Sequence, residues 1–411
     1  MAAWRFYRNP RVTPQALAQP LLQAVRAAVP LHCHDYVLAV HDWSDLSFRS
    51  HASKRDRIVL GQKEEIGYEL HTCLLLSDHD GAPLAPVAQA LKAAGGLISS
   101  RHARVQPLDP VVTNLDRVRG TMRFVRGLQL ARPVVHIIDA EGDSVGHFRA
   151  WSKPRHQWLV RVRGRRKVRH AGQRRSLTAV AAWLGQQQRF RWARPVLFHG
   201  RPAQQYVAEA TVVLDRPARP GRKAARRRPR PVRGTPLTVR LVVSQVRDAA
   251  GQLLAEWLLL TNVPAAVEAA TVALWYYWRW RIESYFKLLK GAGQQVEHWQ
   301  QETAEALARR LLVASMACVV VWQVARASGP EAESLRGLLV RLSGRLVRRQ
   351  QRWTLPALLA GMWVLLAVAE VLAEGNGEAW QWAREAPNRW AGGQRQRRQP
   401  PQPPQPHCQP P

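Results

Sequence analysis

Apolar and polar residues alternate along the first part of the chain in a pattern that predicts strands and helices in turn. Short apolar runs predict buried strands at 36–42, 69–77 and 133–139. The first and last of these runs end in an aspartate, Asp42 and Asp139. Helical spacing of apolar residues is found at 14–29, 86–94 and 114–130. Strands that alternate with helices indicate an α/β layer.

From residue 158 the pattern changes to short β-branched runs separated by Gly, Pro and Arg. Four such runs lie at 158–162, 206–214, 237–246 and 253–261. They predict a β-rich block that follows the α/β layer. Helical spacing then returns over 265–327 and continues over 331–373, which predicts a helical C-terminal region.

The charge balance indicates which class of molecule the protein binds. The chain has 61 Lys and Arg against 29 Asp and Glu, a formal net charge of +32. With 46% hydrophobic residues and 17 Trp, it is too apolar to be a disordered basic tail. We therefore expect a folded protein whose surface attracts phosphates, with nucleic acid favoured over an anionic membrane.

The uncharged runs and the cysteines indicate where in the cell the protein is expected. The longest uncharged runs, 311–322 and 355–369, are shorter than the ~20 residues that span a bilayer, so no membrane partner is expected. The four cysteines form no CxxC pair, which argues against a zinc ribbon or a disulfide framework. We expect a cytoplasmic, nucleoid-associated protein.

Positive charge is densest at 216–234, where nine of nineteen residues are basic and none is acidic. Its centre holds Arg222, Lys223, Arg226, Arg227 and Arg228. A solvated loop explains such a segment, but the chain-wide positive charge favours contact with a nucleic-acid backbone. The tail 387–411 is basic and rich in Pro and Gln, which is typical of a disordered linker.

Candidate chemistry is concentrated at 276–290. On a helix, Tyr276, Arg279, Glu283, Lys287 and Lys290 fall within an arc of ~80°, so one face carries an acid, cations and a phenol. Such a face offers a carboxylate to a metal ion and cations to phosphate oxygens. An ordinary salt-bridged helix has the same pattern, with i,i+4 pairs worth ~0.3 kcal/mol each.

Asp42 and Asp139 extend this set of acids. A single Asp after a strand is commonly a turn or helix cap. Together with Glu283, the two aspartates offer hard oxygen ligands suited to Mg²⁺, with Mn²⁺ as a substitute, rather than to zinc. Two such ions ~4 Å apart activate water and stabilise the leaving oxygen at a phosphodiester.

The spacing Tyr276, two residues, Arg279, three residues, Glu283, six residues, Lys290 resembles the YREK signature of bacterial DDE insertion-sequence transposases of the IS-four group. The stretches 41–48, 67–76, 137–143 and 256–261 also resemble their counterparts in that family, in the expected order. The resemblance covers about 36–290, with weaker similarity in the helices that follow.

The resemblance implies a ribonuclease-H-like catalytic core interrupted by a β-rich insertion domain. Asp42, Asp139 and Glu283 would be its catalytic, metal-binding triad with two Mg²⁺ ions. Tyr276, Arg279, Lys287 and Lys290 would hold DNA phosphates, and Trp257 would stack on a flipped base, although core packing also explains Trp257. The activity implied is cut-and-paste transposition on double-stranded transposon ends and target DNA, by a homodimer.

The expected parts of the chain follow from these assignments. They are a short N-terminal segment (1–35), the first part of the core (36–157), the β-rich insertion (158–256), the second part of the core with the Glu283 helix (257–328), a helical region (329–386) and the disordered tail (387–411).

Departures from the family pattern keep two alternatives open. Trp43 follows the first Asp where the family has small hydroxyl residues, and Ala140 follows the second Asp where it has Arg. Only 41 residues precede Asp42, where the family has an end-recognition domain. One alternative is a truncated or catalytically inactive DNA-binding protein that interferes with transposition. The other is a metal-dependent nuclease without strand transfer.

Overall fold

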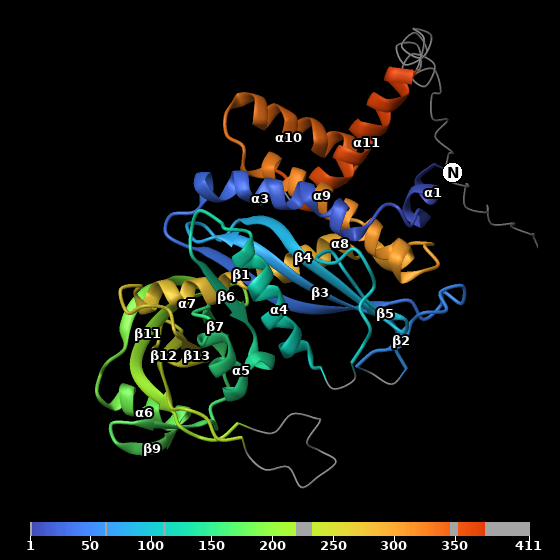
Figure 1. Ribbon diagram of the computed structural model, residues 1–411. Helices are drawn as coiled ribbons and strands as arrows, with labels where there is room; N and C mark the ends of the chain where they lie inside the picture. The colour runs from blue at the N-terminus through green and yellow to red at the C-terminus, as the bar shows by residue number, and fades with distance from the viewer. Residues whose placement is uncertain (1, 62–63, 110–111, 219–231, 346–351, 375–411) are drawn as a thin grey trace, which may run out of the picture. The chain divides into compact units, whose positions relative to one another are not determined.

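The computed structural model describes residues 2–61, 64–109, 112–218, 232–345 and 352–374, and the chain divides into two compact units, Met1–Ala332 and Glu333–Pro411. In the first unit thirteen strands form one mixed sheet (Figure 1). They are β1 Val37–Ser47, β2 Ile58–Val59, β3 Ile66–Ser77, β4 Pro83–Ala93, β5 Gly96–Ser99, β6 Val134–Ile138, β7 Gln157–Arg161, β8 Lys167–His170, β9 Gln173–Ser176, β10 Arg191–Phe198, β11 Arg201–Leu214, β12 Leu237–Arg247 and β13 Leu253–Thr261.

The strand order along the sheet is β5-β4-β3-β1-β6-β7-β13-β12-β11-β8-β9, with β2 paired to β3 and β10 paired to β11. Neighbouring strands are antiparallel from β5 through β4 and β3 to β1, and they are parallel from β1 through β6 to β7. The strands of the predicted β-rich block therefore continue the same sheet, because β13 pairs with β7. The molecule is a mixed α/β structure, as the sequence predicts.

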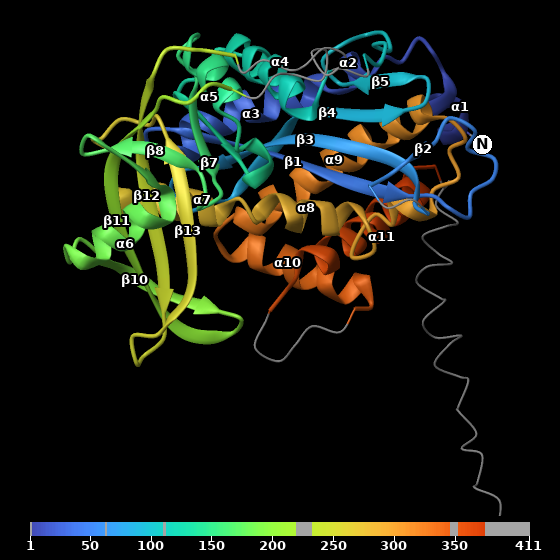
Figure 2. The same cartoon turned by 90° about the horizontal axis from the view of Figure 1, so that it is seen from below.

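Helices lie on both faces of this sheet. They are α1 Ala2–Arg8, α2 Pro14–Leu17, α3 Gln19–His32, α4 Asn114–Gly127, α5 Val145–Ser152, α6 Leu177–Gln186, α7 Ala269–Trp278, α8 Arg281–Leu289 and α9 Ala304–Arg326. Helices α4, α5 and α6 share one buried cluster with β6, β7 and β11–β13, built around Phe148, Trp151 and Trp158. Figure 2 shows α4 and α5 on one side of β1 and β3, with α8 on the other.

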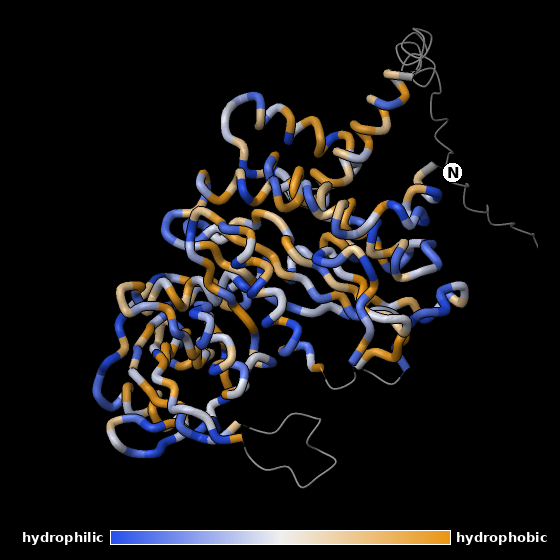
Figure 3. Tube along the Cα trace, viewed as in Figure 1, coloured by the Kyte–Doolittle hydropathy of each residue, from blue (hydrophilic) through white to orange (hydrophobic). Residues whose placement is uncertain are grey.

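Burial follows the apolar pattern of the sequence. Figure 3 shows apolar residues along the strands and polar residues on the loops. The strands at the centre of the sheet are buried on both faces, as the burial of Val37–Val40 and of Leu74–Ser77 shows. A strand that is buried on both faces has a continuous apolar sequence, and this pattern predicted the strands at 36–42, 69–77 and 133–139. The structure confirms all three as β1, β3 and β6.

The predicted helix at 86–94 is wrong, because this segment belongs to strand β4 between β3 and β5. Both faces of β4 are buried, so its Ala and Leu residues carry no period that separates a strand from a helix. Pro86 is accommodated beside a shift in the β3–β4 register, where a ladder hydrogen bond is not required.

Helix α10, Pro330–Ser343, lies mostly in the second unit, and α11, Leu355–Glu374, lies wholly in it; both confirm the helices predicted over 331–373. The two helices touch at Gly361, where an added Cβ would lie 1.9 Å from the Leu339 carbonyl oxygen. Among the described residues, no helix is long and apolar enough to cross a membrane. The basic centre of 216–234 and the tail 387–411 lie outside the described residues, and the finer division into six parts stays a prediction.

Candidate active site

Asp42 lies where the parallel pairing between β1 and β6 ends. Strand β1 pairs in parallel with β6 as far as His41, while its antiparallel pairing with β3 continues to Ser47. Asp42 is therefore inside β1 rather than at its end, which corrects the sequence prediction. Side chains alternate along a strand, and Trp43 packs on the α4–α5 side, so the Asp42 carboxylate faces the opposite side of the sheet.

Asp139 follows the last residue of the neighbouring strand β6, as predicted. It is the N-cap of a short 3₁₀ turn, Ala140–Gly142, and its Oδ1 accepts the Ala140 N–H at 2.5 Å. The parallel pairing of β1 and β6 brings these two aspartates to the same edge of the parallel strands, although they are far apart in sequence.

The predicted helical face at 276–290 is broken in the middle. Helix α7 ends at Trp278 and α8 begins at Arg281, and the amides of Arg279 and Trp280 bond to carbonyls three residues back. This tightened turn places Arg279 at the junction of the two helices. Glu283 then falls in the first turn of α8, on the side of the sheet that Asp42 faces.

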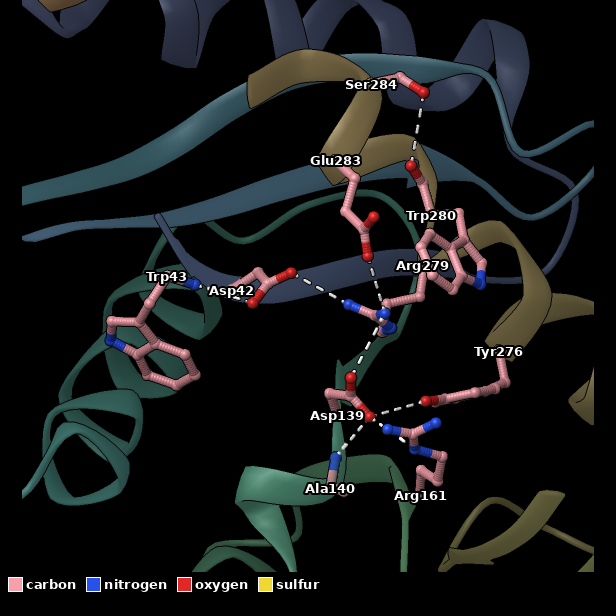
Figure 4. A network of polar contacts seen from close by, with 10 residues as sticks. All are labelled: Asp42, Trp43, Asp139, Ala140, Arg161, Tyr276, Arg279, Trp280, Glu283 and Ser284. Carbon is pink, nitrogen blue, oxygen red and sulfur yellow. Dashed lines mark hydrogen bonds and ion pairs between the residues drawn. The ribbon is translucent and has the colours of Figure 1, made fainter. Parts of the chain in front are cut away.

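A single guanidinium joins the three acids (Figure 4). Arg279 Nη1 lies 3.0 Å from Asp42 Oδ2, and its Nη2 lies 3.3 Å from Asp139 Oδ2 and 3.0 Å from Glu283 Oε1. The Arg279 side chain is only 5% exposed, and its guanidinium also lies 5.1 Å from the Trp280 ring. Carboxylates from strand β1, from the turn that follows β6 and from helix α8 thus surround one buried cation.

Asp139 has further partners that hold its orientation. The Tyr276 hydroxyl donates to Asp139 Oδ1 at 3.0 Å, and Arg161 Nε lies 2.7 Å from the same oxygen. Arg161 ends strand β7, the neighbour of β6, so its side chain comes from the same edge of the sheet as Asp139.

The electrostatics of the two aspartates differ. Burial raises the pKa of Asp42, and Arg279 offsets only part of this effect. Burial alone would raise the pKa of Asp139 too, but Arg279, the Ala140 N–H and Arg161 hold it below its usual value. The pKa of Tyr276 is raised, chiefly by burial and then by Asp139, so the phenol stays protonated and donates.

The donor chemistry of this site fits a hard divalent cation, since carboxylate oxygens are the ligands that Mg²⁺ prefers. The present positions of the side chains suit Arg279 instead. Among the described residues, no group of three or more His, Cys, Asp or Glu side chains is placed so that it could hold a metal ion.

In the described part of the chain, no hydrogen bond or ion pair joins the remaining predicted residues to the three acids. Lys290 caps the end of α8, donates to the Asp45 carbonyl oxygen at 2.5 Å and lies 3.6 Å from Glu297. Lys287 is exposed on α8. Trp257 is half-buried on β13, opposite Ser244 of β12. The structure therefore brings Tyr276, Arg279 and the three acids together, whereas the predicted DNA-binding cations between Arg222 and Arg228 lie outside the described residues.

Sequence reasoning missed two charged residues at the site. Arg161 is the last residue of β7 but lies inside the predicted strand 158–162, so the sequence pattern does not single it out. Glu141 follows two residues after Asp139, and its pKa is raised by burial and by the charges of Asp42 and Asp139. A fourth carboxylate therefore lies within electrostatic reach of the triad.

Buried imidazoles support the same strands from the other face of the sheet. A ring nitrogen of His41 lies 3.0 Å from one of His136, which links β1 to β6, and the His41 ring stacks on His71 of β3. Burial lowers the pKa of all three, that of His71 to about 3, so these rings are neutral. They stiffen the region of β1 and β6 that carries the aspartates.

Comparison with known proteins adds little to this picture. No protein-family model matches the chain, and no curated protein sequence does so. Among solved structures, the chain is similar to the piggyBac transposase in its synaptic complex with hairpin DNA, with a TM-score of 0.34 and 9% sequence identity. The alignment covers 84% of this chain and 55% of that one, so the chain spans about half the length of the transposase. A similarity this low carries no argument, and the function is argued below from the chain's own residues.

Proposed function

We propose that the protein is a DNA transposase of the DDE insertion-sequence kind, with Asp42, Asp139 and Glu283 as its catalytic triad. The observation that carries the proposal is the meeting of these three acids at Arg279, although they come from three elements and lie up to 241 positions apart in the sequence. The spacing of Tyr276, Arg279, Glu283 and Lys290 supports it independently.

The strand order also supports the proposal. In a ribonuclease-H-like core the first two acids stand on neighbouring strands and the third on a helix that packs against them. Here Asp42 lies in β1, Asp139 directly follows the paired strand β6, and α8 brings Glu283 to β1. We propose that residues 36–157 and 257–328 form this core and that residues 158–256 form the insertion.

The triad would hold two Mg²⁺ ions, or Mn²⁺ in their place, which supply activation of water and stabilisation of the leaving oxygen at a phosphodiester. The protein's own contribution is to fix the carboxylates. Arg161 and the Tyr276 hydroxyl hold Asp139 from one side, and its bond to the Ala140 N–H holds it from another. Asp42 is fixed by the Trp43 N–H at 2.9 Å.

Double-stranded DNA is the proposed substrate, both as transposon end and as target, and a homodimer is the proposed active form. Arg279, Lys287 and Lys290 would contact phosphates near the triad, and the Arg222–Arg228 segment would contact the backbone further away. Trp257 would stack on a flipped base. The net charge of +32 supports a polyanionic partner for the whole surface.

The proposal is tested with the purified full chain and DNA that flanks its coding sequence. Glu283→Gln removes one triad charge, and Glu268→Gln makes the same change at an exposed acid before α7. We expect Mg²⁺-dependent cuts at a defined boundary and joining of the freed 3′ end by wild type and Glu268→Gln only.

Other outcomes would identify the alternatives. If wild type binds DNA but does not cut it with either Mg²⁺ or Mn²⁺, the protein is an inactive DNA-binding relic. Cuts without a defined boundary and without joining would indicate a simple nuclease.

A further inference from the structure

Arg279 occupies the position in the site that a ligand of the three carboxylates would need. Its two terminal nitrogens contact Asp42 Oδ2, Asp139 Oδ2 and Glu283 Oε1, one oxygen from each acid, at 3.0–3.3 Å. The side chain is almost fully buried, so the guanidinium is held inside the cluster rather than at its rim. These are the same carboxylates that would bind divalent cations under the proposed function.

The contacts of Arg279 are incomplete in one respect. Its Nε is buried and has no hydrogen-bond partner among the described residues. A buried N–H group without a hydrogen-bond partner costs free energy, and such groups are rare in folded proteins. The side chain also starts from the tightened turn between α7 and α8, which is a place where a side chain can change direction without disturbing a continuous helix.

We propose that Arg279 is a built-in counter-ion of the three acids and competes with divalent cations for them. While its guanidinium pairs with the three acids, its positive charge offsets part of their mutual repulsion and holds them together. A cation gains access to those oxygens only when the guanidinium leaves them. This inference rests on the proposed function, because it takes the triad to be the cation site.

The competition has a quantitative consequence. If only a fraction of the molecules have Arg279 away from the acids, the apparent cation affinity is reduced by that fraction. A phosphate offers the departing guanidinium a bidentate partner, whereas each of the three acids contacts it through one oxygen. One side chain would thereby make cation binding and phosphate binding favour each other, since such coupling is reciprocal.

The test measures Mn²⁺ affinity of the full chain without DNA, by the electron paramagnetic resonance signal of free Mn²⁺. Arg279→Gln removes the competitor. Arg161→Gln is the matched control, because it removes the same charge from a side chain that is 38% exposed and that, among the described residues, forms an ion pair with Asp139 but not with Asp42 or Glu283. Asp42→Asn identifies which Mn²⁺ ions bind at the triad.

We expect Arg279→Gln to bind Mn²⁺ at least ~10-fold more tightly than wild type, and Arg161→Gln to change the affinity by only ~2-fold. Arg279→Lys keeps the charge but loses the planar fork with two terminal nitrogens, so we expect its Mn²⁺ affinity to fall between those of wild type and Arg279→Gln. Without cations, Arg279→Gln should melt at a lower temperature than wild type, and Mn²⁺ should raise its melting temperature by more.

Two results would overturn the inference, and only the second would also contradict the proposed function. If Arg279→Gln and Arg161→Gln have the same affinity, and Asp42→Asn abolishes binding, the triad binds cations but Arg279 does not compete for it. If neither wild type nor Arg279→Gln shows Mn²⁺ binding that depends on Asp42, the proposed function fails together with the inference.

Discussion

The bond network that fixes the Glu283 helix offers a sharp test of the structure. Two residues after Glu283, the buried Tyr285 hydroxyl accepts from Gln89 Nε2 of β4 at 2.6 Å and lies 2.7 Å from Ser315 Oγ of α9. Tyr285→Phe keeps the ring and removes both bonds. Ser315 keeps the Leu311 carbonyl oxygen as a partner, whereas Gln89 Nε2 is left buried without an acceptor. An unsatisfied buried donor costs about 1–3 kcal/mol, so we expect a loss of about 2 kcal/mol in the free energy of unfolding.

Urea unfolding followed by Trp fluorescence measures this loss, since many of the 17 Trp lie in the folded units. The control is Tyr277→Phe, because Tyr277 is 54% exposed on α7 and the same change there should cost under about 0.5 kcal/mol. Equal stability of the two variants would refute the role of the Tyr285 hydroxyl. It would also remove the argument that β4 and α9 position the helix of Glu283.

Three further predictions follow from other parts of the molecule. Because the folded-state pKa of Asp139 is lowered, the stability that wild type has over Asp139→Asn should be present above pH ~4 and shrink as the pH falls further; a difference independent of pH, measured by urea unfolding from pH 6 to 3, would contradict this. DNA affinity should fall steeply with salt, with a log–log slope of about −0.9 per phosphate contacted, and a flat response in a filter-binding titration would remove the argument from charge. Gly67→Ala would place a Cβ 1.9 Å from the Leu46 carbonyl oxygen and should cost about 2 kcal/mol in urea unfolding, whereas Gly95→Ala, which meets nothing within 4 Å, should be neutral; equal effects would refute the close approach of β1 and β3.

The sequence predicted the parts of the site that depend on local pattern. Asp42 and Asp139 could be singled out because each closes an apolar run, and Arg279 and Glu283 because their spacing of four residues lets them meet on a helix. The contact between Arg279 and Asp42 could not be predicted in this way, since 237 positions separate them and only the β1–β6 pairing and the α7–α8 turn bring them together.

The errors have the same origin. Strand β4 was mistaken for a helix because both of its faces are buried, and the break at Arg279 was missed because no Gly or Pro marks it. Arg161 was overlooked because one more Arg in a basic chain carries little information until its neighbour across the sheet is known. Long-range pairing, rather than local propensity, decides these features.

The most direct test of the central claim asks whether the three acids act as one unit. Single-turnover cleavage of DNA with Mg²⁺ would be measured for Asp42→Asn, Asp139→Asn, Glu283→Gln and the triple variant, with folding checked by circular dichroism. Groups that act together are strongly non-additive, so each single variant should fall to the residual rate of the triple variant. A single variant that cuts DNA at the wild-type rate would contradict the account, because its acid would then have no part in the chemistry.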